Sequence, residues 1–309
     1  MGAAWIAGKA VLPALASSSN GRLVAIAARD PARARELALQ HGVARVHQDY
    51  GGVLADREVD AVYIPLANGL HRKWVEEALA AGKHVLCEKP LATTAADAEA
   101  MAAASGRSGG LLMEALMYRF HPRLTEQIES LSAGTVRHVA SYFGFRLDSP
   151  DNYRLRPELG GGALLDVGCY TLDLCRRLLG EPNLVAAVTH LGPTGVDLTV
   201  AASMRFEAGA TAFAWGSFES PEHQLLEVLH DDGVIRILEP FTAWRDPDDP
   251  YQLMVEAFGR AVLDGTPAPH SLSESIATAR LVESVKSAAD GARISATLGA
   301  GPPVGRLDS

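Results

Sequence analysis

Lys83-His84-Val85-Leu86-Cys87-Glu88-Lys89-Pro90 is the stretch around which the chain is organised. A short apolar run follows Gly82 and is stopped by the closing proline, which is typical of a buried strand. Glu88 and Lys89 come at its end, where an open α/β sheet binds its ligands. The stretch therefore predicts a strand that carries a carboxylate and a cation to the mouth of a parallel sheet. Taken alone, these two residues are more typical of a surface ion pair at a strand end.

Composition narrows the class of protein. The 309 residues are 48% hydrophobic and 21% charged, which predicts a globular chain of one or two domains. A net charge of −9 without a long Lys/Arg run argues against nucleic acid and anionic membranes as partners. We expect neither a membrane span nor a signal peptide, and therefore a cytoplasmic protein. Three cysteines without Cys-x-x-Cys spacing predict no disulfide framework and no metal site.

Strands and helices alternate through the first third of the chain. Expected strands are residues 22–28, 60–65, 84–88 and 111–114; expected helices start near Pro13, at Pro31 after the cap Asp30, near Val53, at Leu70 and after Thr94. Such alternation predicts a Rossmann-type, doubly wound parallel sheet, and we place this domain at residues 1–116.

The first residues resemble a dinucleotide-binding turn. Residues 2–7 read Gly-Ala-Ala-Trp-Ile-Ala, where a G-x-G-x-x-G/A turn would lie. We expect Gly2, Ala4, Trp5 and Ile6 to contact a cofactor. Such a turn follows a strand, and only Met1 precedes it here. We expect the true start to lie upstream; a truncated chain and a nucleotide domain that has lost this strand are the alternatives.

The residue after the second strand predicts the kind of cofactor. Arg29 stands where an NAD enzyme places an acidic residue for the ribose hydroxyls. An arginine suits a 2′-phosphate, so NADP is the expected cofactor, with NAD possible. The alternative is a solvated arginine at the start of a helix.

A second informative segment lies in the middle of the chain. Glycines 160–162 lead into a helix expected to end at Gly180. Asp166, Tyr170 and Asp173 are spaced at i, i+4 and i+7, which predicts one polar stripe on an otherwise apolar helix. A functional face and a solvent-facing stripe are both compatible with this spacing.

The remainder of the chain predicts a second domain. Expected strands are residues 136–147, 184–190, 197–206, 210–218, 224–230 and 234–238, and expected helices are residues 125–131, 251–263 and 272–289. Hairpin turns at residues 208–209 and 232–233 indicate a largely antiparallel open sheet. We therefore place an α+β domain at residues 117–298, for substrate binding and oligomerisation, and a loose tail at residues 299–309.

Three motifs in this order resemble those of the glucose–fructose oxidoreductase/inositol dehydrogenase family (Gfo/Idh/MocA). They are Glu88-Lys89-Pro90, Pro65 with His71 six residues later, and the glycine triplet followed by Asp166-x-x-x-Tyr170. Residues 113–122 and the tyrosine of the helix motif are similar to the branch of NADP-dependent D-xylose 1-dehydrogenases and dimeric dihydrodiol dehydrogenases.

The resemblance implies an oxidoreductase that moves a hydride between nicotinamide and a sugar, polyol or diol. It places Lys89 and Tyr170 near the nicotinamide and Asp166 at the substrate. We expect Tyr170 to transfer the proton and Lys89 to lower its pKa. Pro65, Asn68, His71, Glu88 and Lys89 are the further residues expected at the cofactor. A homodimer or homotetramer through the open sheet is expected.

Other functions stay open at this point. A sugar-nucleotide ketoreductase shares most of the same motifs. A catalytically idle NADP-binding regulatory protein is suggested by the incomplete nucleotide turn, although such a protein has no need of both Lys89 and Tyr170. A remnant that binds no cofactor is the third alternative.

Overall fold

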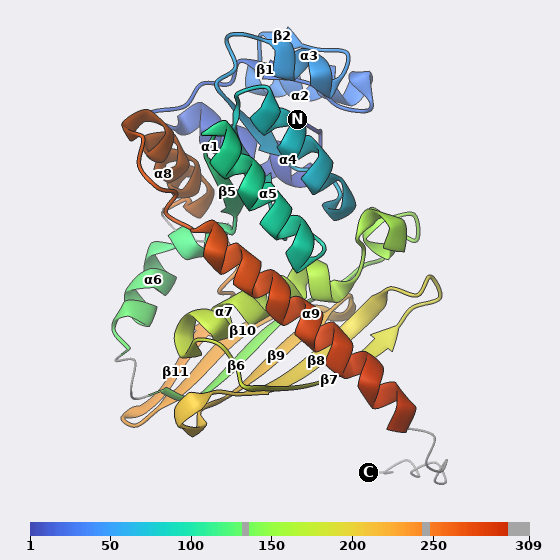
Figure 1. The fold of residues 1–309 in the computed structure, drawn as a ribbon, viewed down its shortest axis with the longest axis vertical. Coiled ribbons are helices and arrows are strands. Elements are labelled where there is room, and N and C mark those ends of the chain that lie inside the picture. Colours follow the sequence, from blue (N-terminus) through green and yellow to red (C-terminus); the bar gives the residue numbers. More distant parts are fainter. Residues whose placement is uncertain (132–135, 243–247, 296–309) are drawn as a thin grey trace.

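The computed structural model describes residues 1–131, 136–242 and 248–295. The chain forms two parts, shown one above the other in Figure 1. Short parallel strands with their helices form the upper part, and one broad sheet covered by helices forms the lower part. The predicted fold class is confirmed.

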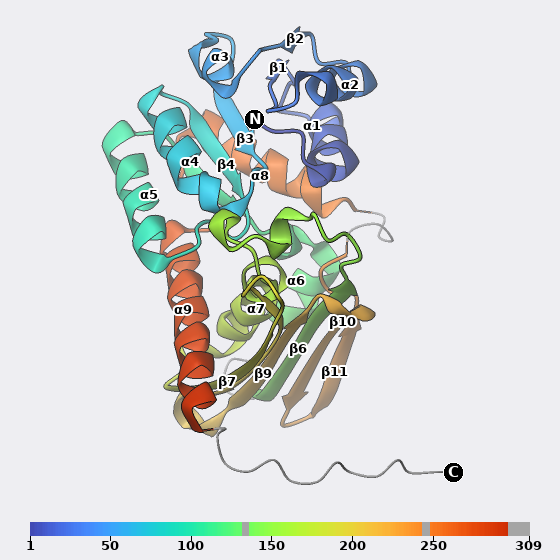
Figure 2. The same ribbon diagram turned by 90° about the vertical axis from the view of Figure 1, so that its right-hand side faces the viewer.

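The upper part alternates strands and helices as predicted. Its elements are η1 (Ala7–Val11), α1 (Leu12–Ser17), β1 (Ala25–Ile26), α2 (Pro31–His41), β2 (Arg45–Val46), α3 (Tyr50–Ala55), β3 (Ala61–Ile64), η2 (Asn68–Leu70), α4 (His71–Ala80), β4 (His84–Glu88), α5 (Ala95–Ser108) and β5 (Leu112–Ala115). β1 pairs in parallel with β2, and β3, β4 and β5 form a second parallel set. Figure 2 shows α4 and α5 on one side of β3 and β4, with α1 on the other.

The first two residues lie between these two sets of strands. The nitrogen of Met1 donates to the carbonyl of Tyr63 at 2.6 Å, and the amide of Gly2 donates to the carbonyl of Ala27 at 2.7 Å. Both hydrogen bonds satisfy backbone groups that a neighbouring strand would otherwise have to pair. Met1 and Gly2 thus occupy the position expected for the end of the first strand.

Capping residues in the sequence predicted several helix ends correctly. The Asp30 carboxylate accepts from the amide of Ala32 to cap α2, and Gly42 ends that helix with a φ of 67°. Thr94 caps α5 in the same way, by accepting from the amide of Asp97. Sequence-level capping rules therefore hold here because each cap is a contact within four residues.

The helix start near Pro13 is confirmed, and one strand is shorter than predicted. Helical turns run from Trp5 through the π-helical turn η1, and α1 begins at Leu12 with Pro13 in its first turn. A proline removes one helical donor and crowds the preceding turn, and the wider π-turn accommodates it. The strand expected at residues 22–28 is reduced to Ala25–Ile26, because its partner β2 is equally short.

The lower part is a six-stranded sheet with helices. Its elements are η3 (Met117–Phe120), α6 (Pro122–Glu129), β6 (Val136–Arg146), η4 (Tyr153–Leu155), η5 (Pro157–Leu159), η6 (Leu164–Gly168), α7 (Cys169–Leu179), β7 (Leu184–Leu191), β8 (Asp197–Arg205), η7 (Glu207–Gly209), β9 (Thr211–Ser217), β10 (Glu219–His230), β11 (Gly233–Leu238), α8 (Pro250–Asp264) and α9 (Leu272–Ser295). The strand order is β11-β10-β6-β9-β8-β7, and every neighbouring pair is antiparallel except β6 with β9. The largely antiparallel sheet and both predicted hairpins are therefore confirmed.

The two faces of this sheet differ. Helix α7 packs on one face, where it contacts β6 and β9 (Figure 2). Strand alternation turns Tyr142, Phe213 and Trp215 to the other face, where the ring of Tyr142 on β6 lies 5.6 Å from that of Phe213 and 6.4 Å from that of Trp215, both on β9. The homo-oligomer expected through this face stays a prediction, as do the domain boundaries, and the predicted tail at residues 299–309 lies outside the described residues.

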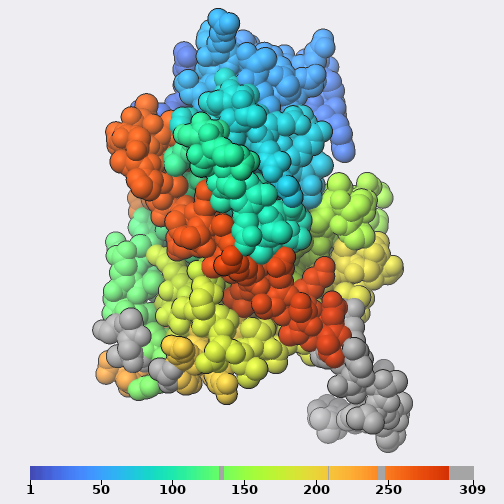
Figure 3. All heavy atoms as spheres, viewed as in Figure 1, coloured from blue at the N-terminus to red at the C-terminus, as the bar shows by residue number. Residues whose placement is uncertain are grey.

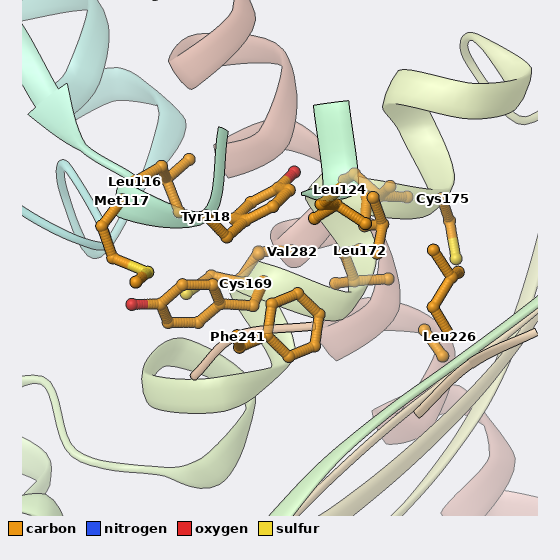
Figure 4. Close-up of a cluster of buried hydrophobic side chains, with 14 of the residues drawn as sticks. Leu116, Met117, Tyr118, Leu124, Cys169, Leu172, Cys175, Leu226, Phe241 and Val282 are labelled. Atoms are coloured by element: carbon orange, nitrogen blue, oxygen red, sulfur yellow. The ribbon is translucent and has the colours of Figure 1, made fainter. Parts of the chain in front are cut away.

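The largest hydrophobic core spans the joint between the two parts. Leu116, Met117 and Tyr118 come from the connection after β5, and they meet Leu172 of α7 and Phe241 (Figure 4). Helix α9 runs across the same joint and contacts both α5 and β7, as Figure 3 shows from outside. The joint is therefore packed with side chains from both parts rather than built as a loose hinge.

Three further features can be stated for the described ranges. None of their helices combines the length and apolar character that crossing a membrane requires. The three cysteines are free thiols, all buried. Within the same ranges no cluster of three or more His, Cys, Asp or Glu side chains is arranged to hold a metal ion.

Truncation of Leu172 should destabilise the fold strongly. Its side chain is 1% exposed between α7 and the sheet, so Leu172→Ala leaves a cavity and should cost about 2–5 kcal/mol of unfolding free energy. Leu263→Ala is the matched control, because Leu263 is 71% exposed on α8. Urea denaturation followed by circular dichroism measures both. Equal midpoints for the two variants would contradict the packing described here.

Candidate active site

The predicted site residues gather where the parallel strands end. Arg29 follows β1, Pro65 follows β3, and Lys89 follows β4, so all three lie at the carboxyl edge of the sheet. This is the edge at which open α/β sheets bind ligands. The glycine triplet of the second part reaches the same edge, because the side-chain amide of Asn68 donates to the carbonyl of Gly160 at 2.8 Å.

Lys89 and Asp166 form the contact at the centre of this edge. The ammonium of Lys89 donates to the Oδ1 of Asp166 at 2.9 Å and to its backbone carbonyl at 2.7 Å. Both side chains are almost fully buried. Burial is the largest single effect and lowers the pKa of Lys89, but Asp166 together with other neighbouring groups raises this pKa above its ordinary value. The lysine is therefore held as a cation.

Arg154 is the site residue that the sequence did not reveal. Its Nε donates to the Oδ2 of Asp166 at 2.6 Å, so the carboxylate of Asp166 lies between two cations. Burial opposes ionisation of Asp166, yet Arg154 and Lys89 together hold its pKa well below the usual range. Arg154 lies in the irregular segment at residues 147–157, where no periodicity indicates the direction of a side chain.

The glycine triplet allows this segment to pack onto the helix. A Cβ at Gly161 would clash with the backbone carbonyl of Arg154, and one at Gly162, where φ is 118°, would clash with the carboxylate of Asp197. The amide of Gly162 instead donates to the carbonyl of Arg154 at 2.9 Å. The Asp197 carboxylate accepts from the amide of Leu164 at 2.5 Å. The triplet thus brings Arg154 to Asp166.

Tyr170 lies beside Lys89 but is not hydrogen-bonded to it. The ammonium of Lys89 is 4.9 Å from the centre of the Tyr170 ring, on its face. Aromatic rings of Phe143 and Phe241 lie 5.5 Å and 5.2 Å from it. In the described part of the chain no hydrogen bond reaches the hydroxyl of Tyr170, which leaves this group available to a bound molecule.

The expected lowering of the pKa of Tyr170 is wrong for this structure. Burial raises the pKa of its hydroxyl well above the ordinary value, and Tyr251 and Glu88 add to that effect. The cation that would lower the pKa donates to Asp166 instead. Tyr170 is therefore in its protonated form here.

The solvent-stripe alternative for the helix is also wrong. Asp166, Tyr170 and Asp173 are all buried, at 5%, 6% and 0% exposure. Asp173 accepts two hydrogen bonds from Arg119, at 2.8 and 2.9 Å, and others from the hydroxyls of Tyr118 and Thr278. Asp166 and Tyr170 of the stripe therefore face Lys89, whereas Asp173 anchors the helix to η3 and α9.

Glu88 and His71 brace the strand ends. Glu88 accepts from the hydroxyl of Tyr63 on β3 at 2.6 Å and from the amide of Lys89 at 3.2 Å. The ring nitrogens of His71 lie 2.9 Å and 3.0 Å from the carbonyls of Pro90 and Leu66. Burial raises the pKa of Glu88 and lowers that of His71. In this structure His71 is fully buried and ties together the loops that follow β3 and β4.

The first turn fits a dinucleotide. Gly2 has a φ of 111°, and a Cβ there would lie 2.9 Å from the Leu66 side chain, so only glycine lets the backbone pass close to β3. Helical turns begin at Trp5, which leaves the amides of the preceding turn at a helix N-terminus, the arrangement that binds phosphates. Arg29 is exposed at the end of the adjacent strand β1. These residues fit the part of a dinucleotide cofactor that carries the adenosine and the phosphates.

Comparisons with known proteins identify the family of this chain. Residues 1–116 match the model of the oxidoreductase family with an NAD-binding Rossmann fold, and residues 121–236 match the GFO/IDH/MocA C-terminal domain. A D-xylose 1-dehydrogenase (NADP⁺) from Haloferax volcanii is 40% identical over 94% of this chain and 96% of its own length.

Solved structures give the same result. The aldose-aldose oxidoreductase from Caulobacter crescentus, complexed with glycerol, has a TM-score of 0.87 at 28% identity, over 95% of this chain and 97% of that chain. A 3-ketoreductase from Actinomadura kijaniata, in complex with NADP, has a TM-score of 0.83 at 30% identity, over 93% and 95% of the two chains. The family models and the Haloferax relative cover most of the chain, and it therefore belongs to the Gfo/Idh/MocA family of oxidoreductases.

Proposed function

We propose that this protein transfers a hydride between NADP and a carbon of a sugar, polyol or related diol. The observation that carries the proposal is the buried Lys89–Asp166 pair beside Tyr170, at the carboxyl edge of a nucleotide-type sheet. A cation, a carboxylate and a phenol at one place are what a hydroxyl–carbonyl interconversion requires. The cofactor, when bound, supplies or accepts the hydride.

The proton is assigned to Tyr170. In the reducing direction its protonated hydroxyl donates to the oxygen of a carbonyl, which becomes an alcohol. In the oxidising direction the same group must accept the proton of an alcohol, and the ammonium of Lys89 lies close enough to stabilise the resulting phenolate. Lys89 also places a positive charge where the reacting oxygen becomes negative.

Asp166 and Arg154 are assigned as positioning residues. Asp166 holds the ammonium of Lys89 through two hydrogen bonds, and Arg154 fixes the other oxygen of Asp166. A lysine alone has three rotatable donors on a flexible stem, so a fixed acceptor is what gives it one orientation. Arg154 also belongs to residues 147–157, which we propose shape the substrate end of the site.

A sugar-nucleotide ketoreductase is the second candidate. The Actinomadura kijaniata neighbour supports it, since that protein is a 3-ketoreductase with a similar fold. Assays with simple aldoses and with a keto-sugar nucleotide, each with NADP or NADPH, separate the two. Titration of NADPH followed by tryptophan fluorescence separates both from an idle cofactor-binding protein, which would bind without turnover.

Tyr170→Phe and Lys89→Met should each reduce turnover at least about 100-fold, the usual contribution of one acid–base group. Phenylalanine keeps the buried ring of Tyr170 and methionine keeps most of the lysine stem, so NADPH binding should survive in both. Steady-state kinetics and the fluorescence titration measure the two properties separately. Near-full activity in either variant would remove that residue from the mechanism.

Arg29→Ala should reduce the preference for NADPH over NADH. A guanidinium–phosphate contact contributes about 1.5–3 kcal/mol, so the ratio of the two affinities should fall by about tenfold or more. Arg107→Ala is the control, because it removes an exposed arginine near the end of α5. An unchanged ratio in Arg29→Ala would show that Arg29 does not contact the 2′-phosphate.

Asp166→Asn should make stability less sensitive to acid. The folded-state pKa of Asp166 is depressed, so its ionised form stabilises the fold at neutral pH, and this contribution is lost as the pH falls. Between pH 5 and pH 3 the wild type should lose about 1 kcal/mol more unfolding free energy than the variant. Urea titrations at both pH values measure this difference.

The control is Asp151→Asn, which removes an exposed carboxylate from the same segment as Arg154. It should lose as much stability as the wild type over this range. Parallel losses in wild type and Asp166→Asn would mean that Asp166 is not held ionised by its two cations.

A further inference from the structure

A cavity lies away from Lys89 and Tyr170. It has a volume of about 560 Å³ and lies between η3, α7, α8 and the segment that leads into α9. Sites for small molecules typically measure about 300–1,000 Å³. Arg119, Arg177 and Arg260 line this cavity together with His270, and we call these four residues the arginine pocket.

The arginine pocket carries more cationic than anionic groups. Asp264 is the one carboxylate in its lining as far as the described residues form it. Arg260 is 57% exposed, and its Nη1 lies 3.9 Å from the Oε2 of Glu256. The Nη1 of Arg177 is buried and has no hydrogen-bond partner among the described residues. Two guanidinium groups thus keep donors for an anion.

The inner wall of the arginine pocket is fixed in place. Arg119 donates to both oxygens of Asp173 and, through Nη1, to Glu274 at 2.7 Å. His270 is 1% exposed, and its Nε2 lies 2.9 Å from the hydroxyl of Ser275. These donors are already engaged, so Arg119 and His270 contribute the shape and positive field of the wall. Arg177 and Arg260 are left to contact a ligand.

We propose that the arginine pocket binds a small molecule through a phosphate or carboxylate group. The planar guanidinium matches both groups with paired hydrogen bonds, and a buried donor without a partner is costly unless an acceptor reaches it. The volume leaves room for a body beyond the anionic group. Pro267 and Pro269 in the lining provide an apolar surface for that body.

The arginine pocket touches the rear of the active site. Arg119 holds Asp173, which accepts from the hydroxyl of Tyr118, and the ring of Tyr118 lies 6.0 Å from that of Tyr170. On the other side, His270 lies 3.3 Å from Glu114, whose other oxygen accepts from the amide of Leu91. A ligand in the pocket would therefore contact residues that support both ends of the catalytic pair.

Calorimetric titration of the full chain with inorganic phosphate, and separately with citrate, at constant ionic strength, tests the proposal. At least one probe should bind the wild type saturably, and the dissociation constant should rise about tenfold or more in Arg177→Gln, because a charge-assisted contact is lost. Arg260→Gln should weaken binding in the same direction, and it changes an exposed side chain that folding does not require. Phosphate binding more tightly identifies the phosphate form of the ligand, and citrate binding more tightly the carboxylate form.

Two further variants make the result specific. Arg57→Gln removes an exposed arginine from the loop after α3 and should bind as the wild type does. Arg29→Gln reports on phosphate bound at the proposed cofactor site. Loss of binding in Arg29→Gln with full binding in Arg177→Gln and Arg260→Gln would overturn the proposal, and so would equal affinity in all variants or no saturable binding of either probe.

Discussion

The ammonium of Lys89 and the carboxylate of Asp166 meet across 77 residues of sequence, and the site depends on that contact. Lys89 comes from a strand end of the nucleotide-type part, and Asp166 from the helical turn η6 of the other part. A buried ion pair contributes little net stability compared with apolar side chains of the same shape. The pair serves to orient the two side chains. An unpaired cation buried at this depth would be costly, and only a narrow range of positions brings the ammonium close enough to the carboxylate to avoid that cost.

That geometry has to be held from both sides. On the Lys89 side, Tyr63 fixes Glu88, and His71 fixes the carbonyl of Pro90, so the end of β4 is hydrogen-bonded in two directions. On the Asp166 side, Arg154 takes the second oxygen of the carboxylate. The packed core at the joint prevents the two parts from moving independently at this point. Precise placement of one ammonium thus requires loops from both parts of the chain.

Sequence reasoning recovered the features that depend on neighbours along the chain. The caps Asp30 and Thr94, the strand at residues 84–88 and the two hairpins all follow from contacts within a few residues or from period-two alternation. The motifs led to Lys89, Asp166 and Tyr170, and the structure brings those three together.

What sequence reasoning missed depends on tertiary contacts. Arg154 lies in a segment without periodicity, and its direction is set by the carbonyl contacts that glycines 160–162 permit. Burial also reversed the expected direction of the pKa shift at Tyr170, while the ammonium of Lys89 donates to Asp166 rather than to the phenol. Desolvation cannot be read from spacing, because it depends on rings such as Phe143 and Phe241 that come from distant strands.

Helix α7 and the turn before it explain why one stripe carries two acidic groups. Asp166 faces Lys89 at the joint, whereas Asp173 is enclosed completely because Arg119, Tyr118 and Thr278 satisfy it. A helix anchored only by apolar contacts could slide or rotate by a fraction of a turn at small cost. A buried carboxylate with several directional partners resists such movement, since any displacement leaves a charge unsatisfied. Asp173 therefore fixes the rotation of the helix about its axis, and that rotation determines where Asp166 and Tyr170 face Lys89.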